Sequence, residues 1–580
     1  MGAVVSAFSG LKLLWTTIAG LNRDFDRVKA RVEAAPGFPN SIPQPTTSEW
    51  QPAAGHKFDT LGRPLPTSVD ILIIGSGVTA CAIAKTILHD FVAESIGKDG
   101  KSLSIAIVDA REICSGATGR NGGHIKESAY LEYSVLLKRK KSPEVAKAIT
   151  RFRMDHRKRL KEVADEMKVT DKCEIRDVDS VDVFFADEAW DEARKDLRVF
   201  QEAFPDEASK FTELDNDLAV KKYGLKGIRG VIEGTAGALS PYLFTTSIFS
   251  RLLQATPSLS IHPNTVVTDV RRRRGFYDVT ISSPSEDLRP VARRCTSTSM
   301  LSKVESKVTK TATRTALSAC CPSTMESPTS DFPSTGRTIR ATTVIHATNA
   351  YVSNLLPELR SKIIPVRGQM TSVRPQAPQG DVRKSPLSPG RSWSFIYDKG
   401  FDYLITRQSG DVMLGGGWAQ GSGGGLDDVG IASDAENSLL SSSHLLGLLP
   451  AIFDDTVLKG VEVKGVWSGA IGMSVDLLPW VGETPESISN RKGNESDRKG
   501  NDSDRKGNDS KGEWVCAGFS GEGMVNAWGC GEALAKQIVE RHTNKKLLAV
   551  DQHLVIPEDM KITKKRLEKA SLTDLAEAWD

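Results

Sequence analysis

The segment GSGVTA, residues 75–80, has residue types and a spacing that suit the binding of a diphosphate. It follows an apolar run over 69–74, which we expect to be a buried parallel strand, and precedes apolar residues at helical spacing over 82–88. Gly75 allows a tight turn, Gly77 lets a pyrophosphate approach the backbone at a helix N-terminus, and the small Ala80 lets helix and strand pack closely. Because a strand and a helix flank the motif, we predict a dinucleotide-binding unit here.

A second apolar strand is predicted over 103–110, with Asp109 near its end. A carboxylate at this place accepts hydrogen bonds from the ribose hydroxyls of an adenosine and repels a 2′-phosphate. The alternative is an ordinary surface carboxylate at a strand end.

The stretch AREICSGATGRNGGH, residues 110–124, follows directly and is rich in glycine, so it packs little of a core. Its bare backbone is suited to cradle the rest of a dinucleotide with N–H groups. A nicotinamide enzyme does not usually need a second glycine-rich run here, whereas in a flavin enzyme this segment wraps the diphosphate and passes beneath the isoalloxazine ring. We therefore predict that a flavin dinucleotide is bound here by Ala110, Arg111, Ser115, Gly116, Thr118, Asn121, Gly122, Gly123 and His124.

Together, GSGVTA and VDAREICSGATGRNGGH resemble the D-amino-acid oxidase and glycine/sarcosine oxidase superfamily of FAD-dependent oxidoreductases. The RNGGH variant is most similar to the subgroup that includes gamma-glutamylputrescine oxidases. Residues 237–253, 261–270, 340–357 and 515–539 resemble further segments of the superfamily in the same order. The resemblance implies more cofactor contacts, from Val266 and Val267 at the adenine, from Ala347 and Thr348, and from Gly518, Ser520, Gly521, Gly523 and Met524 at the flavin. The helix that follows Gly523 would stabilise negative charge on the reduced ring.

These segments imply an α/β fold, α+β overall, with a Rossmann-type FAD-binding domain built on a parallel sheet and a second lobe built on an antiparallel sheet. The expected boundaries are 1–66 for an apolar helix and Pro-rich lead-in, 67–130, 237–356 and 474–545 for the FAD-binding segments, 131–236 and 357–473 for the substrate lobe, and 546–580 for a tail. Two inserts interrupt the FAD-binding segments and are predicted to be disordered. One is rich in Ser and Thr (284–338), and the other consists of near-copies of a charged heptad (491–512).

The resemblance implies oxidation of a CH–NH bond in a small amine or amino acid by hydride transfer to flavin N5, followed by hydrolysis of the imine, with oxygen or another acceptor taking the electrons. In glycine-oxidase-like relatives an arginine at the place of Arg407 binds the substrate carboxylate. A solvated arginine at a strand end is nearly as good an interpretation. Arg367 and Gln369 are alternative substrate ligands, and Tyr403 and Trp418 either wall a pocket or pack in the core.

Departures from the superfamily pattern concern the flavin segment and its attachment. Glu522 replaces the usual histidine, Val525 replaces the lysine of sarcosine-oxidase-like members, and residues 467–483 contain no cysteine to anchor FAD. His124 does not coincide with the linkage histidine of dimethylglycine-dehydrogenase-like relatives, so we predict that it lies near the ring without a bond to it. These differences imply non-covalent FAD, and Glu522 suits a cationic amine better than an amino acid. The alternatives are a flavin-binding scaffold or sensor without turnover, and a CH–OH oxidoreductase on the same fold.

The composition is that of a globular protein, with 580 residues, a net charge of +3 and 39% hydrophobic residues. Such a charge gives no general attraction to nucleic acid. The eight cysteines lack CxxC spacing, which argues against zinc and disulfides and predicts no metal site. The stretch 2–21 is too interrupted for a transmembrane helix, but MGAVVS matches the myristoylation pattern at Gly2. A helix packed on the protein's own surface is an equal alternative. We expect a cytoplasmic protein, with peripheral membrane contact through the N-terminus if Gly2 is acylated.

Overall fold

The computed structural model describes residues 23–34, 45–52, 58–91, 102–140, 142–282, 337–376, 385–489, 512–547 and 555–576. Gly2 with the N-terminal apolar stretch, almost all of the Ser- and Thr-rich insert and almost all of the heptad repeat lie outside these residues. None of the helices in the described ranges is both long enough and apolar enough to span a bilayer.

An eight-stranded sheet forms one layer of the molecule, with the order β16–β17–β10–β1–β2–β7. Its central strands are parallel, and an antiparallel hairpin of β8 and β9 joins it through β10. The bounds are β1 Ser68–Ile74, β2 Ile105–Val108, β7 Leu259–His262, β8 Val266–Arg272, β9 Tyr277–Ser282, β10 Arg337–His346, β16 Trp480–Glu483 and β17 Glu513–Ala517.

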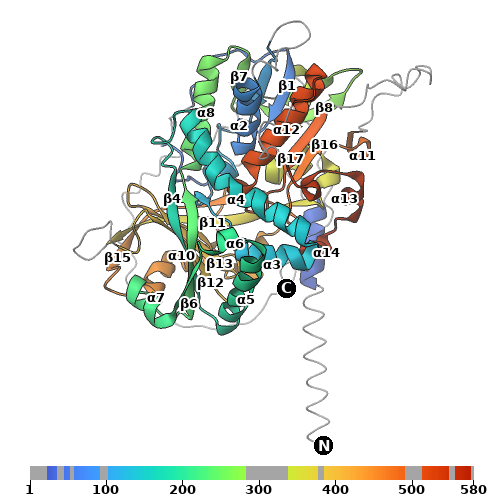
Figure 1. Cartoon of the computed structure of the whole chain (residues 1–580). Coiled ribbons are helices and arrows are strands. Elements are labelled where there is room, and N and C mark those ends of the chain that lie inside the picture. Colours follow the sequence, from blue (N-terminus) through green and yellow to red (C-terminus); the bar gives the residue numbers. More distant parts are fainter. Residues whose placement is uncertain are drawn as a thin grey trace, which may run out of the picture.

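Both faces of the parallel strands are buried, which is why β1 is a continuous apolar run. Ile71 and Ile73 pack with helices α2 (Val78–Lys85), α8 (Pro241–Ala255) and α12 (Ala527–Thr543) in one core cluster. Leu72 and Ile74 pack on the opposite face with residues of β8 and β9. Figure 1 shows these three helices around the parallel sheet in the upper part of the molecule.

A nine-stranded, mainly antiparallel sheet forms the second layer, with the order β15–β11–β14–β13–β12–β4–β6–β3 and with β5 beside β6. Only β12 and β4 pair in parallel among these neighbours. The bounds are β3 His124–Ile125, β4 Arg176–Phe184, β5 Thr212–Asp215, β6 Gly230–Ala238, β11 Ile363–Gln376, β12 Arg391–Ile396, β13 Phe401–Thr406, β14 Val412–Gly416 and β15 Gly460–Ser474. A tight turn at 409–411 joins β13 to β14, and Gly410 has the positive φ of +87° that this turn requires.

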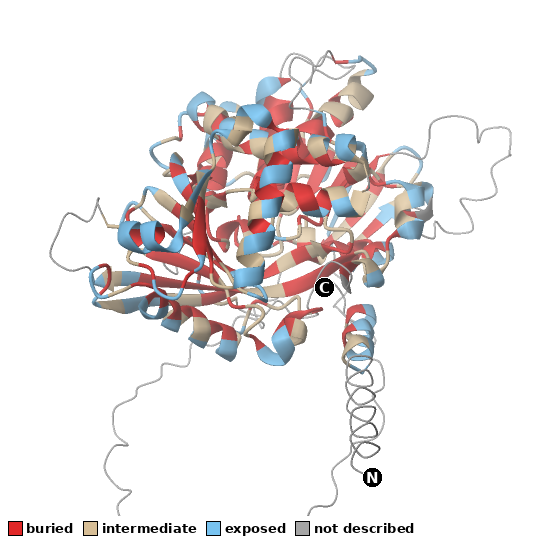
Figure 2. Cartoon of the chain, turned by 60° about the horizontal axis from the view of Figure 1, so that its bottom comes forward, coloured by how far each residue is buried: buried red, intermediate tan, exposed pale blue. Residues whose placement is uncertain are grey.

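Amphipathic helices cover the second sheet and the junction between the two sheets. In Figure 2 their inner faces are buried and their outer faces exposed. Helix α4 begins at Pro143 because Ser142 caps it by accepting a hydrogen bond from the Val145 N–H. The remaining helices are α3 Ala129–Lys140, α4 Pro143–Glu166, α5 Asp187–Ala203, α6 Pro205–Ala208, α7 Asn216–Tyr223, α9 Val352–Leu355, α10 Leu439–Ile452, α11 Glu486–Ser489, α13 Lys564–Lys569 and α14 Leu572–Ala576, with one further helix over 23–34. The predicted α/β class, with one parallel and one antiparallel sheet, is confirmed.

Candidate active site

A cavity of about 910 Å³ is lined by residues of both sheets and by the loops at their ends. Most of the predicted cofactor residues contribute to its wall: Gly75, Gly77, Asp109, Ala110, Arg111, Gly116, Thr118, Asn121, Gly122, His124, Val266, Val267, Ala347, Thr348, Ser520, Gly521, Gly523 and Met524. Four predicted residues, Ala80, Ser115, Gly123 and Gly518, do not line it. Segments far apart in the sequence therefore meet at one hollow that is large enough for a dinucleotide.

The turn between β1 and α2 brings bare backbone to the cavity. Gly75 has a φ of +104°, and a Cβ added there would lie 2.6 Å from the Ala347 carbonyl oxygen. Gly77 is the N-cap of α2 and lacks a side-chain cap, so the first N–H groups of the helix remain largely available to a ligand. The Val78 N–H is the exception, because it donates to Thr118 Oγ1 at 3.0 Å. The helix N-terminus and its dipole make this end of the cavity suitable for a diphosphate.

Asp109 lines the cavity at the end of β2, as a ribose ligand would. One of its carboxylate oxygens accepts hydrogen bonds from the Ser76 N–H (2.9 Å) and hydroxyl (2.6 Å), and the other accepts from the Arg111 N–H (3.0 Å). Burial raises the pKa of Asp109, and the hydrogen bond from Ser76 opposes this shift. The carboxylate is thus held in place by the two glycine-rich segments that it joins.

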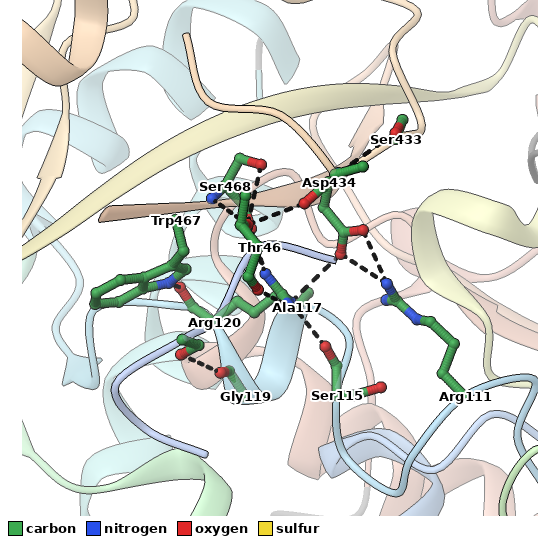
Figure 3. A network of polar contacts seen from close by, with 12 residues as sticks. Thr46, Arg111, Ser115, Ala117, Gly119, Arg120, Ser433, Asp434, Trp467 and Ser468 are labelled. Carbon is green, nitrogen blue, oxygen red and sulfur yellow. Dashed lines mark hydrogen bonds and ion pairs between the residues drawn. The ribbon is translucent and has the colours of Figure 1, made fainter. Parts of the chain in front are cut away.

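A buried ion cluster, which no local sequence pattern indicated, holds the stretch 110–124 (Figure 3). Arg111 donates to both carboxylate oxygens of Asp434 (2.8 and 2.9 Å), and Arg120 Nε lies 3.3 Å from the same carboxylate. Arg120 also donates to the backbone oxygens of Ser115, Thr46 and Ser468 at 2.6–2.8 Å. Burial is the main reason that the pKa of Arg120 falls, to about 10. Asp434 belongs to the loop between β14 and α10, so its ion pairs attach this loop to the stretch 110–124.

His124 and Tyr403 form an aromatic corner of the cavity wall. The two rings meet edge to face at 5.1 Å, and a Cβ at Gly122 would lie 2.6 Å from the Tyr403 ring. His124 Nδ1 lies 2.7 Å from Ser392 Oγ, whereas its buried Nε2 has no hydrogen-bond partner among the described residues. Burial, and to a lesser extent Lys126, lowers the pKa of His124 to about 3, so the ring is neutral at pH 7.

Two carboxyl groups, from Glu522 and Glu132, line the cavity beside the C-terminal glycine-rich segment. Glu132 accepts a hydrogen bond from the buried Arg153 at 2.8 Å. Burial, and to a lesser extent the nearby Glu132, raises the pKa of Glu522 to about 8, although Arg153 opposes the shift. A carboxyl group that changes charge near neutral pH is suited to take up or release a proton.

Gln369 lines the cavity, but its amide is occupied by protein groups. Its Nε2 donates to the Trp467 carbonyl oxygen (2.6 Å) and to Asn437 Oδ1 (3.1 Å), and its Oε1 accepts from the Ser438 N–H (2.9 Å). The amide is therefore engaged in joining β11, β15 and the start of α10, which makes it a poor substrate ligand.

The structure places Arg407 outside the cavity lining. Its guanidinium pairs with Glu174 at 3.3 Å and stacks over the Trp50 ring at 4.9 Å. This placement speaks against the expectation that Arg407 binds a substrate carboxylate, because its guanidinium is already paired with Glu174. The sequence could not reveal this, since Glu174 and Trp50 lie far from Arg407 along the chain.

Among the described residues, no group of three or more His, Cys, Asp or Glu side chains is placed to hold a metal ion. A protein-family model described as FAD dependent oxidoreductase matches residues 70–292 and 323–537. No curated protein matches the chain in sequence.

Several solved structures share the fold at low sequence identity. Glycine oxidase from Geobacillus kaustophilus is 17% identical, with a TM-score of 0.54 over 86% of this chain and 99% of that one. L-amino acid deaminase from Proteus myxofaciens, solved with anthranilate, is 12% identical, with a TM-score of 0.53 over 90% and 97%. L-proline dehydrogenase from P. horikoshii is 15% identical, with a TM-score of 0.51 over 88% and 100%.

Proposed function

Because the chain belongs to the family of FAD-dependent oxidoreductases, we propose that it oxidises the CH–NH bond of a small amine or amino acid with non-covalently bound FAD. The observation that carries this proposal is a single cavity whose wall contains the uncapped N-terminus of α2 and the carboxyl groups of Glu132 and Glu522. Bound FAD supplies the hydride acceptor for such a reaction.

The residues present fit FAD. The N–H groups at Gly77 would hold the diphosphate, Asp109 the ribose hydroxyls, and Val266 with Val267 the adenine. The loop around Gly521 and Gly523 would hold the flavin end. Arg111 and Arg120 also bring two guanidinium groups, which share the buried carboxylate of Asp434, to the stretch beside the diphosphate.

The chain's own residues then orient the substrate and exclude water from it. Tyr403, held edge to face against His124, gives the cavity a fixed aromatic wall. His124 Nε2 offers a neutral hydrogen-bonding atom, and Glu522 holds or takes up a proton at its carboxyl oxygen. Water hydrolyses the resulting imine.

Anaerobic mixing of the holoprotein with a panel of amines and amino acids tests the proposal through loss of the oxidised flavin absorbance. Bleaching by at least one amine or amino acid is expected. Bleaching only by alcohols or hydroxy acids would favour CH–OH oxidation, and a flavin that no substrate reduces would favour a binding protein without turnover.

The purified protein is expected to be yellow and to release its FAD on denaturation with acid or heat. The physical reason is that residues 467–483 contain no cysteine to form a covalent bond to the flavin. The measurement is flavin fluorescence in the supernatant after precipitation. Flavin that stays with the precipitate would show a covalent link, for which the unpartnered Nε2 of His124 would then be the first candidate.

We also propose that Gly2 is myristoylated and gives peripheral membrane contact. A single myristoyl chain binds membranes only marginally, with an association constant on the order of 10⁴ M⁻¹. The Gly2→Ala variant is therefore expected to shift from the membrane to the soluble fraction. An intact mass without the acyl chain, in a host that can attach it, would contradict the proposal.

A further inference from the structure

The cationic side chains in the cavity wall already have carboxylate partners. Among the described residues these cations are Arg111 and Arg120, which share Asp434, Lys126, which pairs with Asp182 at 2.6 Å, and Arg367, which pairs with Asp428 at 2.7 Å. Arg111 and Arg120, which share one carboxylate, belong to the cofactor stretch 110–124. In the remainder of the wall, Lys126 is matched by Asp182, and Arg367 by Asp428 with Glu436 at 4.0 Å. The wall outside the cofactor stretch therefore offers no spare positive charge to a substrate carboxylate.

The carboxyl groups at the flavin end of the cavity, in contrast, are not all paired with cations. Glu522 lines the cavity, and its carboxyl group forms no hydrogen bond or ion pair with any other described residue. Four ionisable groups face it from the surrounding elements: Glu132 on α3, Arg153 on α4, Glu127 after β3 and Tyr403 on β13. The one cation in this group, Arg153, is hydrogen-bonded to Glu132. With all three carboxyl groups ionised, this end of the cavity would carry an excess of negative charge.

We propose that Glu522 binds the substrate's ammonium group and that the substrate is a cationic amine without a carboxylate on the oxidised carbon. This inference rests on the proposed function and narrows its substrate class. Glu522 has no cationic hydrogen-bond partner among the described residues, and a substrate ammonium group that donates an N–H to Glu522 Oε would be that partner. A carboxylate on the same carbon would enter a region whose cations are already neutralised, where it would meet Glu132 and Glu522.

The ionisation of Glu522 gives the proposal a signature in pH. Burial raises the pKa of this carboxyl group to about 8, so in the free protein it is mostly protonated at pH 7. A bound ammonium ion favours the ionised form, and binding therefore releases a proton below pH 8. The affinity for the cation should rise with pH up to about pH 8, because Glu522 must lose its proton when the cation binds. Glu522→Gln removes this rise, because its amide does not titrate.

Amino acids and their decarboxylated amines make matched probes for this proposal. Pentylamine against norleucine and phenethylamine against phenylalanine differ only by the carboxylate on the reacting carbon. The measurement is the anaerobic rate of flavin reduction per substrate concentration at pH 8. This rate is expected to be about 100-fold higher for each amine than for its amino acid, because an unpaired carboxylate in a desolvated site is unfavourable by about that factor.

Substitutions of Glu522 test whether this side chain causes the preference for amines over amino acids. Glu522→Gln is expected to lower the amine rate constant by about 100-fold with FAD content unchanged, and Glu522→Asp to restore part of it. The matched control is Arg407→Gln, which alters a charge outside the cavity lining and should leave both substrates unaffected. Faster reduction by the amino acids, or a normal rate in Glu522→Gln, would overturn the inference while the proposed function stands.

A binding measurement remains decisive if none of these probes reduces the flavin, a result that would count against the proposed function alone. Phenethylammonium, which carries both the charge and the N–H donors, is expected to perturb the absorption spectrum of bound FAD in the wild-type protein and not in Glu522→Gln. Benzoate, its anionic counterpart, is expected to leave the spectrum unchanged. Perturbation by benzoate, or none by the ammonium ion, would show that Glu522 is not a cation site.

Discussion

Replacement of Asp434 by asparagine is expected to lower the free energy of unfolding by about 3–5 kcal/mol and to strip most of the FAD from the protein. Asp434 is 2% exposed, and its carboxylate serves both Arg111 and Arg120. Loss of its charge leaves two buried guanidinium groups without their paired carboxylate, and they cannot regain water without opening the cavity wall. Because both arginines belong to the stretch 110–124, the damage reaches the cofactor directly.

The matched control for this change is Asp427→Asn, in the same loop. Asp427 pairs with Arg27 at 3.0 Å, and both side chains are more than one third exposed. An exposed pair of this kind contributes about 0–1 kcal/mol, so the control should keep its stability and its FAD. Thermal unfolding and the ratio of flavin to protein absorbance measure the two effects. Equal behaviour of the two variants would show that the buried cluster does not hold the cofactor segment.

The parts of the fold that the sequence predicted well depend on local patterns. The apolar run before Gly75 and the helical spacing after it predict β1 and α2 because neighbouring residues decide both elements. The turn at 409–411 is likewise encoded by its own residues, including the positive φ of Gly410. The resemblance then supplied the order of the remaining segments, and the family match confirms the FAD-dependent class.

The partners of charged side chains could not be predicted in this way. Asp434 meets Arg111 across 323 residues of sequence, and Arg407 meets Glu174 across 233. Nothing in the local sequence tells whether an arginine at a strand end faces a cavity or a carboxylate that is distant in the sequence. For the same reason the sequence could not show that the amide of Gln369 forms hydrogen bonds to β15 and to the residues before α10. Glu522 was noticed only because it departs from a motif, and its charged surroundings emerged from the packing of α3 and α4 around it.

The two sheets explain why one chain can bind a cofactor and a substrate at a common cavity. The chain passes repeatedly between them, so that β1 and β2 are followed by β3 to β6 in the second sheet and then by β7 to β10 in the first. Each passage leaves a loop or a strand end near the cavity, and glycine-rich loops occupy the ends that face the cofactor. A substitution in one of these loops should therefore weaken FAD binding more strongly than it lowers the stability of the hydrophobic cores.

Replacement of Gly75 by alanine is expected to abolish FAD binding and to lower the free energy of unfolding by about 2–5 kcal/mol, the sum of backbone strain and overpacking. Gly75 has a φ of +104°, and an added Cβ would lie 2.6 Å from the Ala347 oxygen and 3.0 Å from its carbonyl carbon. These are backbone atoms at the end of β10, so relief requires β1 and β10 to separate beneath the phosphate-binding turn. Gly275→Ala is the matched control, because it adds a Cβ in open space at a φ of +79° and should cost about 1 kcal/mol with FAD retained. Flavin content and thermal unfolding of the two variants decide the matter: a Gly75→Ala protein that still binds FAD would show that the cofactor's diphosphate does not depend on this turn.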